Sequence, residues 1–152
     1  MNVFLRITCS SLLRKNNEVD KQRLFFEGQI YDAFSFMVSL VQKAEKEIIL
    51  IDNYAGVGTL NVLSKKKENV DVQLFTSKKA KITQSDIEKF NTQYPKLTLN
   101  YTETFHDRFL IIDEAIAYSI GSSVKDAGKR CFAVTKINEE WMVKMILGRI
   151  SK

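Results

Sequence analysis

The segment HDRFLIID at residues 106–113, followed by GSS at residues 121–123, decides how this chain is interpreted. His106 is the chain's one histidine. Around it, a cation at Arg108 and a carboxylate at Asp113 flank an apolar run typical of a buried strand. The later Gly-Ser pair indicates a turn. Any mechanism that needs two histidines must therefore take the second one from another copy of the chain.

Outward from this segment, apolar periodicity predicts alternating strands and helices. The residues at 29–46 have helical spacing, and EIILID at 47–52 is a short buried run. Helices are expected at 29–46, 59–67, 85–94 (capped by Thr83) and 139–150, and strands at 3–8, 47–52, 70–76, 97–102, 108–112, 115–120 and 131–136. Strands separated by helices, then strands in quick succession, predict an α/β fold: a mixed β-sheet with helices on both faces.

Length and composition bound the organisation of the chain. With 152 residues, 45% of them hydrophobic, it can bury one substantial core. The single proline and the absence of a Gly/Ser-rich stretch give no internal linker. We therefore expect one domain at 25–152, preceded by a segment at 1–24 that holds an N-terminal strand and is otherwise poorly assigned.

The composition favours a cytoplasmic protein with polyanionic partners. No run approaches the roughly 20 apolar residues of a membrane span, and the first residues lack the pattern of a signal peptide. Two cysteines are too few for a disulfide framework, and both are expected to be reduced and buried. The net charge is +5, with lysine clusters at 65–67 and 78–81 and further cations at 125–130. This balance favours nucleic acid or an acidic lipid surface.

The residues around His106 suit phosphodiester chemistry. A neutral imidazole can attack phosphorus, provided that cations hold the phosphate oxygens and a proton reaches the leaving group. In a strand that begins near residue 105, His106 and Arg108 would share a face, and Asp113 would orient His106 or pair with Arg108. Gly121 would let the backbone approach the anion, to which Ser122 and Ser123 would donate hydrogen bonds.

The pattern H-x-R-x4-D with a trailing G-S resembles the H-x-K-x4-D…G-S motif of the phospholipase D superfamily, and most of all its single-motif bacterial members, which include endonucleases. The resemblance implies a phospholipase D-like fold and a homodimer in which His106 of each copy meets across a twofold axis. One histidine would form a phosphohistidine and the other would act as general acid. Neither a metal nor a cofactor is implied.

Two positions depart from the family pattern. Arg108 replaces a lysine, and Lys125 stands where the family often has asparagine. Lys125 is expected to hold the phosphate in its place, so phosphate binding should survive better than turnover. The leading hypothesis is a metal-independent phosphodiesterase that acts on nucleic acid as a DNA endonuclease. The alternative is a catalytically inactive nucleic-acid-binding or regulatory module; lipid hydrolysis is weaker, because no basic amphipathic helix is evident. Asp52, at the end of a predicted strand, is a candidate for a supporting role.

Overall fold

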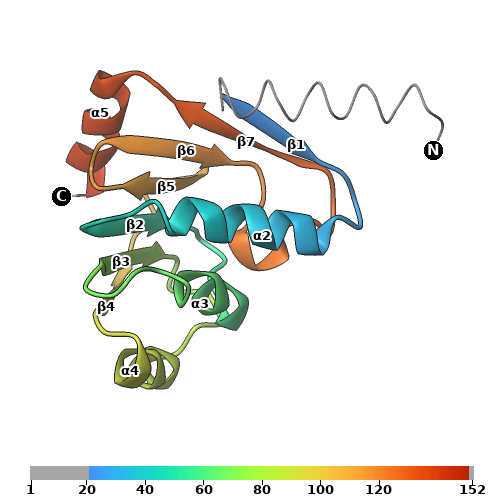
Figure 1. Ribbon diagram of the computed structural model, residues 1–152. Coiled ribbons are helices and arrows are strands. Elements are labelled where there is room, and N and C mark those ends of the chain that lie inside the picture. Colours follow the sequence, from blue (N-terminus) through green and yellow to red (C-terminus); the bar gives the residue numbers. More distant parts are fainter. Residues whose placement is uncertain (1–20, 151–152) are drawn as a thin grey trace, which may run out of the picture.

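The computed structural model describes residues 21–150, which form a mixed seven-stranded sheet with helices on both faces (Figure 1). The strand expected at 3–8 lies outside the described residues. The sheet order is β1-β7-β6-β5-β2-β3-β4. Its strands are β1 (Gln22–Phe25), β2 (Glu47–Ile51), β3 (Asp71–Thr76), β4 (Leu97–Tyr101), β5 (Arg108–Ile112), β6 (Ile116–Ile120) and β7 (Phe132–Ile137). The helices are α2 (Ile30–Val41), α3 (Val57–Leu63), α4 (Gln84–Gln93) and α5 (Glu140–Ile150), with a short 3-10 helix η1 (Val124–Asp126).

The connections explain which strands run parallel. Helices α3 and α4 carry the chain back between β2, β3 and β4, which are parallel, whereas short links place β5, β6 and β7 antiparallel. Ile51 at the end of β2 lies opposite Phe109 at the start of β5. The ends of β2, β3, β4 and β6 therefore share one edge of the sheet with the start of β5. We call this the carboxyl edge, and the opposite one, where β2, β3 and β4 begin, the amino edge.

The sheet separates two apolar layers. On one face, Leu50 and Leu110 pack with buried residues of α2, α3 and α4 such as Met37. On the other face, Ile111 packs with Val143 of α5. Neighbouring residues of β2 and β5 thus belong to opposite layers, which is the alternation of a strand buried on both sides. The predicted α/β class and the two-sided covering are confirmed.

Local details depart from the sequence expectations at three places. Helix α2 ends at Val41, before the expected residue 46, because the chain turns at 42–44 to enter β2. Strand β1 was not predicted, and it crosses the position between residues 24 and 25 at which we expected the domain to start. Cys131 is exposed, contrary to expectation, and its Sγ donates to Glu27. The Thr83 cap of α4 is confirmed, since its hydroxyl accepts from the N–H of Asp86. Between residues 21 and 150, no helix is long and apolar enough to cross a bilayer.

Candidate functional site

The carboxyl edge brings together most of the residues selected from the sequence. Asp52 directly follows β2, His106 lies just before β5 and Arg108 begins it, and the segment from Gly121 to Lys125 follows β6. In an α/β sheet, ligands bind outside the carboxyl ends of the parallel strands. The candidate site is therefore at this edge, and the position of each side chain decides what it can do there.

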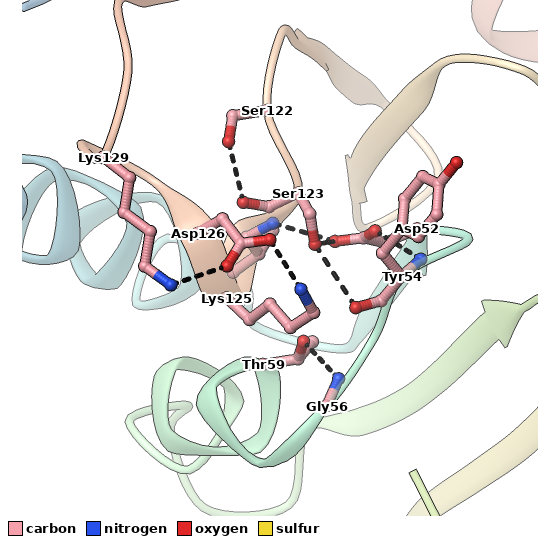
Figure 2. A network of polar contacts seen from close by, with 10 residues as sticks. Asp52, Tyr54, Gly56, Thr59, Ser122, Ser123, Lys125, Asp126 and Lys129 are labelled. Atoms are coloured by element: carbon pink, nitrogen blue, oxygen red, sulfur yellow. Dashed lines mark hydrogen bonds and ion pairs between the residues drawn. The ribbon is translucent and has the colours of Figure 1, made fainter. Parts of the chain in front are cut away.

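Asp52 fixes the Gly-Ser segment to the end of β2 (Figure 2). Its side chain is fully buried. One carboxylate oxygen accepts from the Ser123 hydroxyl at 2.9 Å and from the N–H of Val124 at 2.8 Å, and the other accepts from the N–H of Tyr54 at 3.0 Å. Burial raises the pKa of Asp52, although these donors and the charge of Arg108 act in the opposite direction. Asp52 is thus an internal anchor of the site.

The same contacts correct the expected role of Ser123. Its hydroxyl is buried and donates to Asp52, so Ser123 is not available to donate to an anion from outside. The Ser122 hydroxyl, which is half-buried, donates to the carbonyl oxygen of Ser123. A hydroxyl can rotate, and so of the two serines only Ser122 can turn its donor toward a bound phosphate.

The Arg108 side chain holds the Gly-Ser turn that follows β6. Its Nε donates to the carbonyl oxygen of Ile120 at 3.3 Å and its Nη2 to that of Gly121 at 2.9 Å. A guanidinium has five N–H donors, so these two bonds leave others for a ligand. Arg108 therefore combines two tasks: it holds the Gly-Ser turn in place and it keeps a permanent positive charge at the carboxyl edge.

His106 stands apart from Arg108. Strand β5 begins at Arg108, and His106 lies in the bend before it, so the prediction that both share one strand face was wrong. The His106 side chain is exposed and lines an open pocket of about 300 Å³ with Phe109, Met145 and Arg149, whereas Arg108 does not line it. Asn53 Nδ2 donates to the carbonyl oxygen before His106 at 2.8 Å, which ties this bend to the end of β2.

Asp113 does not reach His106, which corrects the sequence expectation. It follows β5 at the amino edge, where its carboxylate accepts from the N–H groups of Glu45, Lys46 and Glu47 at 2.8–3.3 Å. Asp113 also has a φ of 54°, a left-handed value that aspartate tolerates in turns. Its role in the described structure is to join the β5–β6 turn to the start of β2.

We expect Asp113→Ala to lower the free energy of unfolding by about 1–3 kcal/mol, since three backbone donors lose a charged acceptor. Desolvation alone would raise the pKa of Asp113, but the N–H groups of Glu47, Glu45 and Lys46 together lower it. A lowered folded-state pKa means that this stability is present above the ordinary value of 3.8 and is lost as pH falls through the folded value.

Urea unfolding at neutral and acidic pH would measure both effects. Asp113→Asn is the matched control, because asparagine keeps one acceptor oxygen and tolerates the left-handed backbone. A loss of stability in the alanine variant that does not shrink at low pH would contradict this account.

Lys125 belongs to a second group of polar contacts, which is visible in Figure 2. Its Nζ contacts Asp126 at 2.5 Å, and Lys129 Nζ contacts the other oxygen of Asp126 at 3.0 Å. The bond from Lys125 is the first cause that lowers the pKa of Asp126. A Cβ at Gly56 or Gly58 would lie 3.1 Å from carbons of the Lys125 side chain. The Gly56-Val57-Gly58 stretch therefore starts α3 and leaves room for Lys125.

A polar pocket beside these residues was not predicted. It has a volume of about 230 Å³ and is lined by Asn53, Tyr54, Ser77, Lys79 and Glu103. These residues follow β2, β3 and β4, so they meet at the carboxyl edge. The signal was present in the sequence, since polar residues directly after predicted parallel strands are expected to converge. Within residues 21–150, no three side chains of His, Cys, Asp or Glu gather in a way that could hold a metal ion.

Comparison with solved structures shows that the fold is similar to those of two known proteins. Nuc from Salmonella typhimurium, a phospholipase D family member, is 17% identical, with a TM-score of 0.60 over 84% of this chain and 90% of its own. The chain has a phospholipase D-like fold. NucT from Helicobacter pylori is 11% identical, with a TM-score of 0.59 over 85% of this chain and 92% of its own.

A third structural neighbour is TrmBL2, an archaeal chromatin protein whose structure shows a novel mode of DNA binding. It is 16% identical, with a TM-score of 0.56, and the match covers 96% of this chain and 58% of TrmBL2. No family model matches the sequence, and a search of curated proteins finds no match. At these identities the structural likeness establishes the fold, and the function must be argued from the site.

Proposed function

We propose that this chain is a metal-independent phosphodiesterase that acts on nucleic acid, and specifically on DNA. Its complete active site requires two copies of the chain. The observation that carries the proposal is the position of His106. It is the chain's one histidine, and it is exposed at the carboxyl edge of a phospholipase D-like fold, two residues before Arg108. An exposed imidazole can meet both a substrate and the same residue of a second copy.

The proposed reaction balances with two histidines. Neutral His106 of one copy attacks phosphorus, so that an N–P bond forms as the bond to the leaving oxygen breaks. Protonated His106 of the second copy gives its proton to that oxygen. Water then attacks phosphorus while the now neutral histidine takes its proton, and the N–P bond breaks. In this proposal Arg108 and Ser122 would stabilise the charge on the phosphate oxygens during both steps.

The described residues of a single copy lack two of the groups that the proposed reaction uses, a second histidine as general acid and a carboxylate that orients the nucleophile. Among residues 21–150, no hydrogen bond or ion pair connects His106 to a carboxylate, and Asp113 lies at the amino edge. An isolated copy therefore has no second histidine to act as general acid, and no carboxylate of residues 21–150 is hydrogen-bonded to its nucleophile. A twofold arrangement of two copies supplies the acid without any new residue.

A second candidate, a nucleic-acid-binding module without turnover, is favoured by different contacts. Two N–H donors of Arg108 bond to backbone carbonyl oxygens, and Lys125 forms an ion pair with Asp126. Both groups are therefore partly committed inside the protein, and the neighbour TrmBL2 is described as a DNA-binding chromatin protein. In this case the carboxyl edge would hold the backbone of DNA and release it unchanged.

Both candidates predict binding that weakens steeply with salt. The cations after β3 at 78–81 and after β6 at 125–130 lie at the carboxyl edge, and each phosphate contact releases counterions. We expect log K against log salt to have a slope of roughly −3 to −5, and Lys78→Ala with Lys79→Ala to reduce it by about 1–2. Lys65→Ala is the matched control, since Lys65 lies between α3 and β3 at the amino edge. Salt-independent retention of DNA would contradict both candidates.

Cleavage in excess EDTA separates the candidates. Purified protein would be incubated with plasmid and with single-stranded DNA, and products would be followed on gels beside a binding assay on the same samples. Product formation by the native chain supports the phosphodiesterase. Salt-sensitive binding with no product under any condition supports the binding module. If the protein neither cleaves nor binds DNA, both proposals are wrong.

A further inference from the structure

We propose that the pocket lined by Asn53, Tyr54, Ser77, Lys79 and Glu103 binds one unpaired nucleobase next to a phosphate held at the carboxyl edge, so that the chain prefers single-stranded nucleic acid. The inference rests on the proposed function and adds to it the form of the substrate. It follows from the position, the size and the chemistry of the pocket.

The pocket is physically joined to the His106 bend and to the Gly-Ser turn. Asn53 lines it and donates to the carbonyl oxygen of Phe105, the residue before His106. Tyr54 lines it as well, and its carbonyl oxygen lies 3.5 Å from the Ser123 hydroxyl. A strand whose phosphate lies at His106 and Ser122 therefore passes beside this pocket. The neighbouring base of that strand is the part of the ligand that can enter it.

The pocket is sized for a single ring system. Its volume of about 230 Å³ is below the roughly 300–1,000 Å³ of sites that hold drug-sized ligands. The Tyr54 side chain extends away from the Lys125–Asp126 pair (Figure 2) and is 60% exposed, so its ring is available for stacking. Aromatic side chains at the edge of a charged groove are the usual platform for unpaired bases.

The polar lining is prepared to read the edge of a base. One oxygen of Glu103 accepts from the Ser77 hydroxyl at 3.0 Å and from the N–H of Lys78 at 3.3 Å, which fixes the carboxylate. No contact within residues 21–150 occupies its other oxygen, which can accept from a ring or amino N–H. Lys79 lines the same pocket, and its Nζ has no described partner, so it can donate to a ring nitrogen or carbonyl. The base edges that fit this pair are already used in a duplex, which is why the pocket selects unpaired strands.

Fluorescence anisotropy with labelled oligonucleotides of about 12 residues, single-stranded and duplex, tests the inference. We expect Tyr54→Ala to weaken single-strand binding about 5- to 150-fold and to leave duplex binding unchanged. Tyr31→Ala is the matched control, because Tyr31 is an exposed tyrosine on α2 that does not line the pocket. Thermal melting of each variant confirms that the fold is kept.

Glu103→Gln gives a second, independent readout. Glutamine keeps an oxygen for Ser77 and Lys78 but replaces the free acceptor by an amide N–H₂ donor. We expect the variant to bind single strands of dC, dA and dT about fivefold or more weakly, because each of these bases offers an amino or ring N–H to the acceptor that is lost, and to bind duplex DNA as the native chain does. Nucleic-acid binding that neither substitution changes would overturn the nucleobase pocket alone. Absence of binding to single strands and duplexes at low salt would overturn the proposed function with it.

Discussion

His106→Ala is expected to lower DNA cleavage at least about 10³-fold, because the substitution removes the nucleophile from one copy and the general acid from the other. The His106 side chain is exposed and no described hydrogen bond depends on it, so folding should be unaffected. Initial rates on plasmid in excess EDTA measure the effect. Lys65→Ala, at an exposed position of the amino edge, should cleave like the native chain. A fully active His106→Ala protein would exclude the phosphohistidine reaction.

Mixed pairs test whether the two histidines come from different copies. If both must be present, a pair with one alanine is inactive, and activity falls with the square of the native fraction. Equal amounts of native and His106→Ala chains, refolded together, should then retain about one quarter of the native activity. Retention of one half, as independent single-copy sites require, would contradict the two-copy site and leave His106 as a nucleophile with some other acid.

The sequence predicted the elements well where burial imposes a period. The sequence runs that form β2, β3 and β5 are apolar because helices cover these strands on both faces of the sheet. Strand β1 is short and lies at the edge of the sheet, and three of its four residues are not fully buried. An edge strand of this kind has too few constrained side chains to produce a pattern.

The site was less predictable because motif spacing does not say which end of a strand a residue occupies. His106 and Asp113 are seven positions apart, and an extended chain rises about 3.3 Å per residue, so the strand itself separates them by on the order of 20 Å. That arithmetic was available from the sequence. The Asp52–Ser123 contact was not, since it joins residues 71 positions apart through the pairing order of the sheet.

Asp52→Ala is expected to cost about 2–4 kcal/mol of unfolding free energy, the larger of the two stability effects predicted for this chain. The substitution leaves the Ser123 hydroxyl and the N–H groups of Val124 and Tyr54 without their acceptor, and unsatisfied donors in a buried place are expensive. Part of this cost is offset, because alanine also removes a carboxylate that is unfavourable to ionise there. Asp107→Ala, which replaces an exposed aspartate of the same edge, is the control and should change stability by less than about 0.5 kcal/mol.

The pH dependence gives this prediction its sign. Burial raises the pKa of Asp52 in the folded state, so its protonated form is the better accommodated one. The corresponding stability is fully present below the ordinary value of 3.8 and is lost as pH rises through the raised folded value. Other carboxyl groups, Asp113 among them, act in the opposite direction, so the quantity to measure is the difference between the native chain and Asp52→Asn in urea unfolding. The native chain should lose stability relative to Asp52→Asn as pH rises across that window, and a difference that is constant with pH would show that burial does not disfavour the ionised carboxylate.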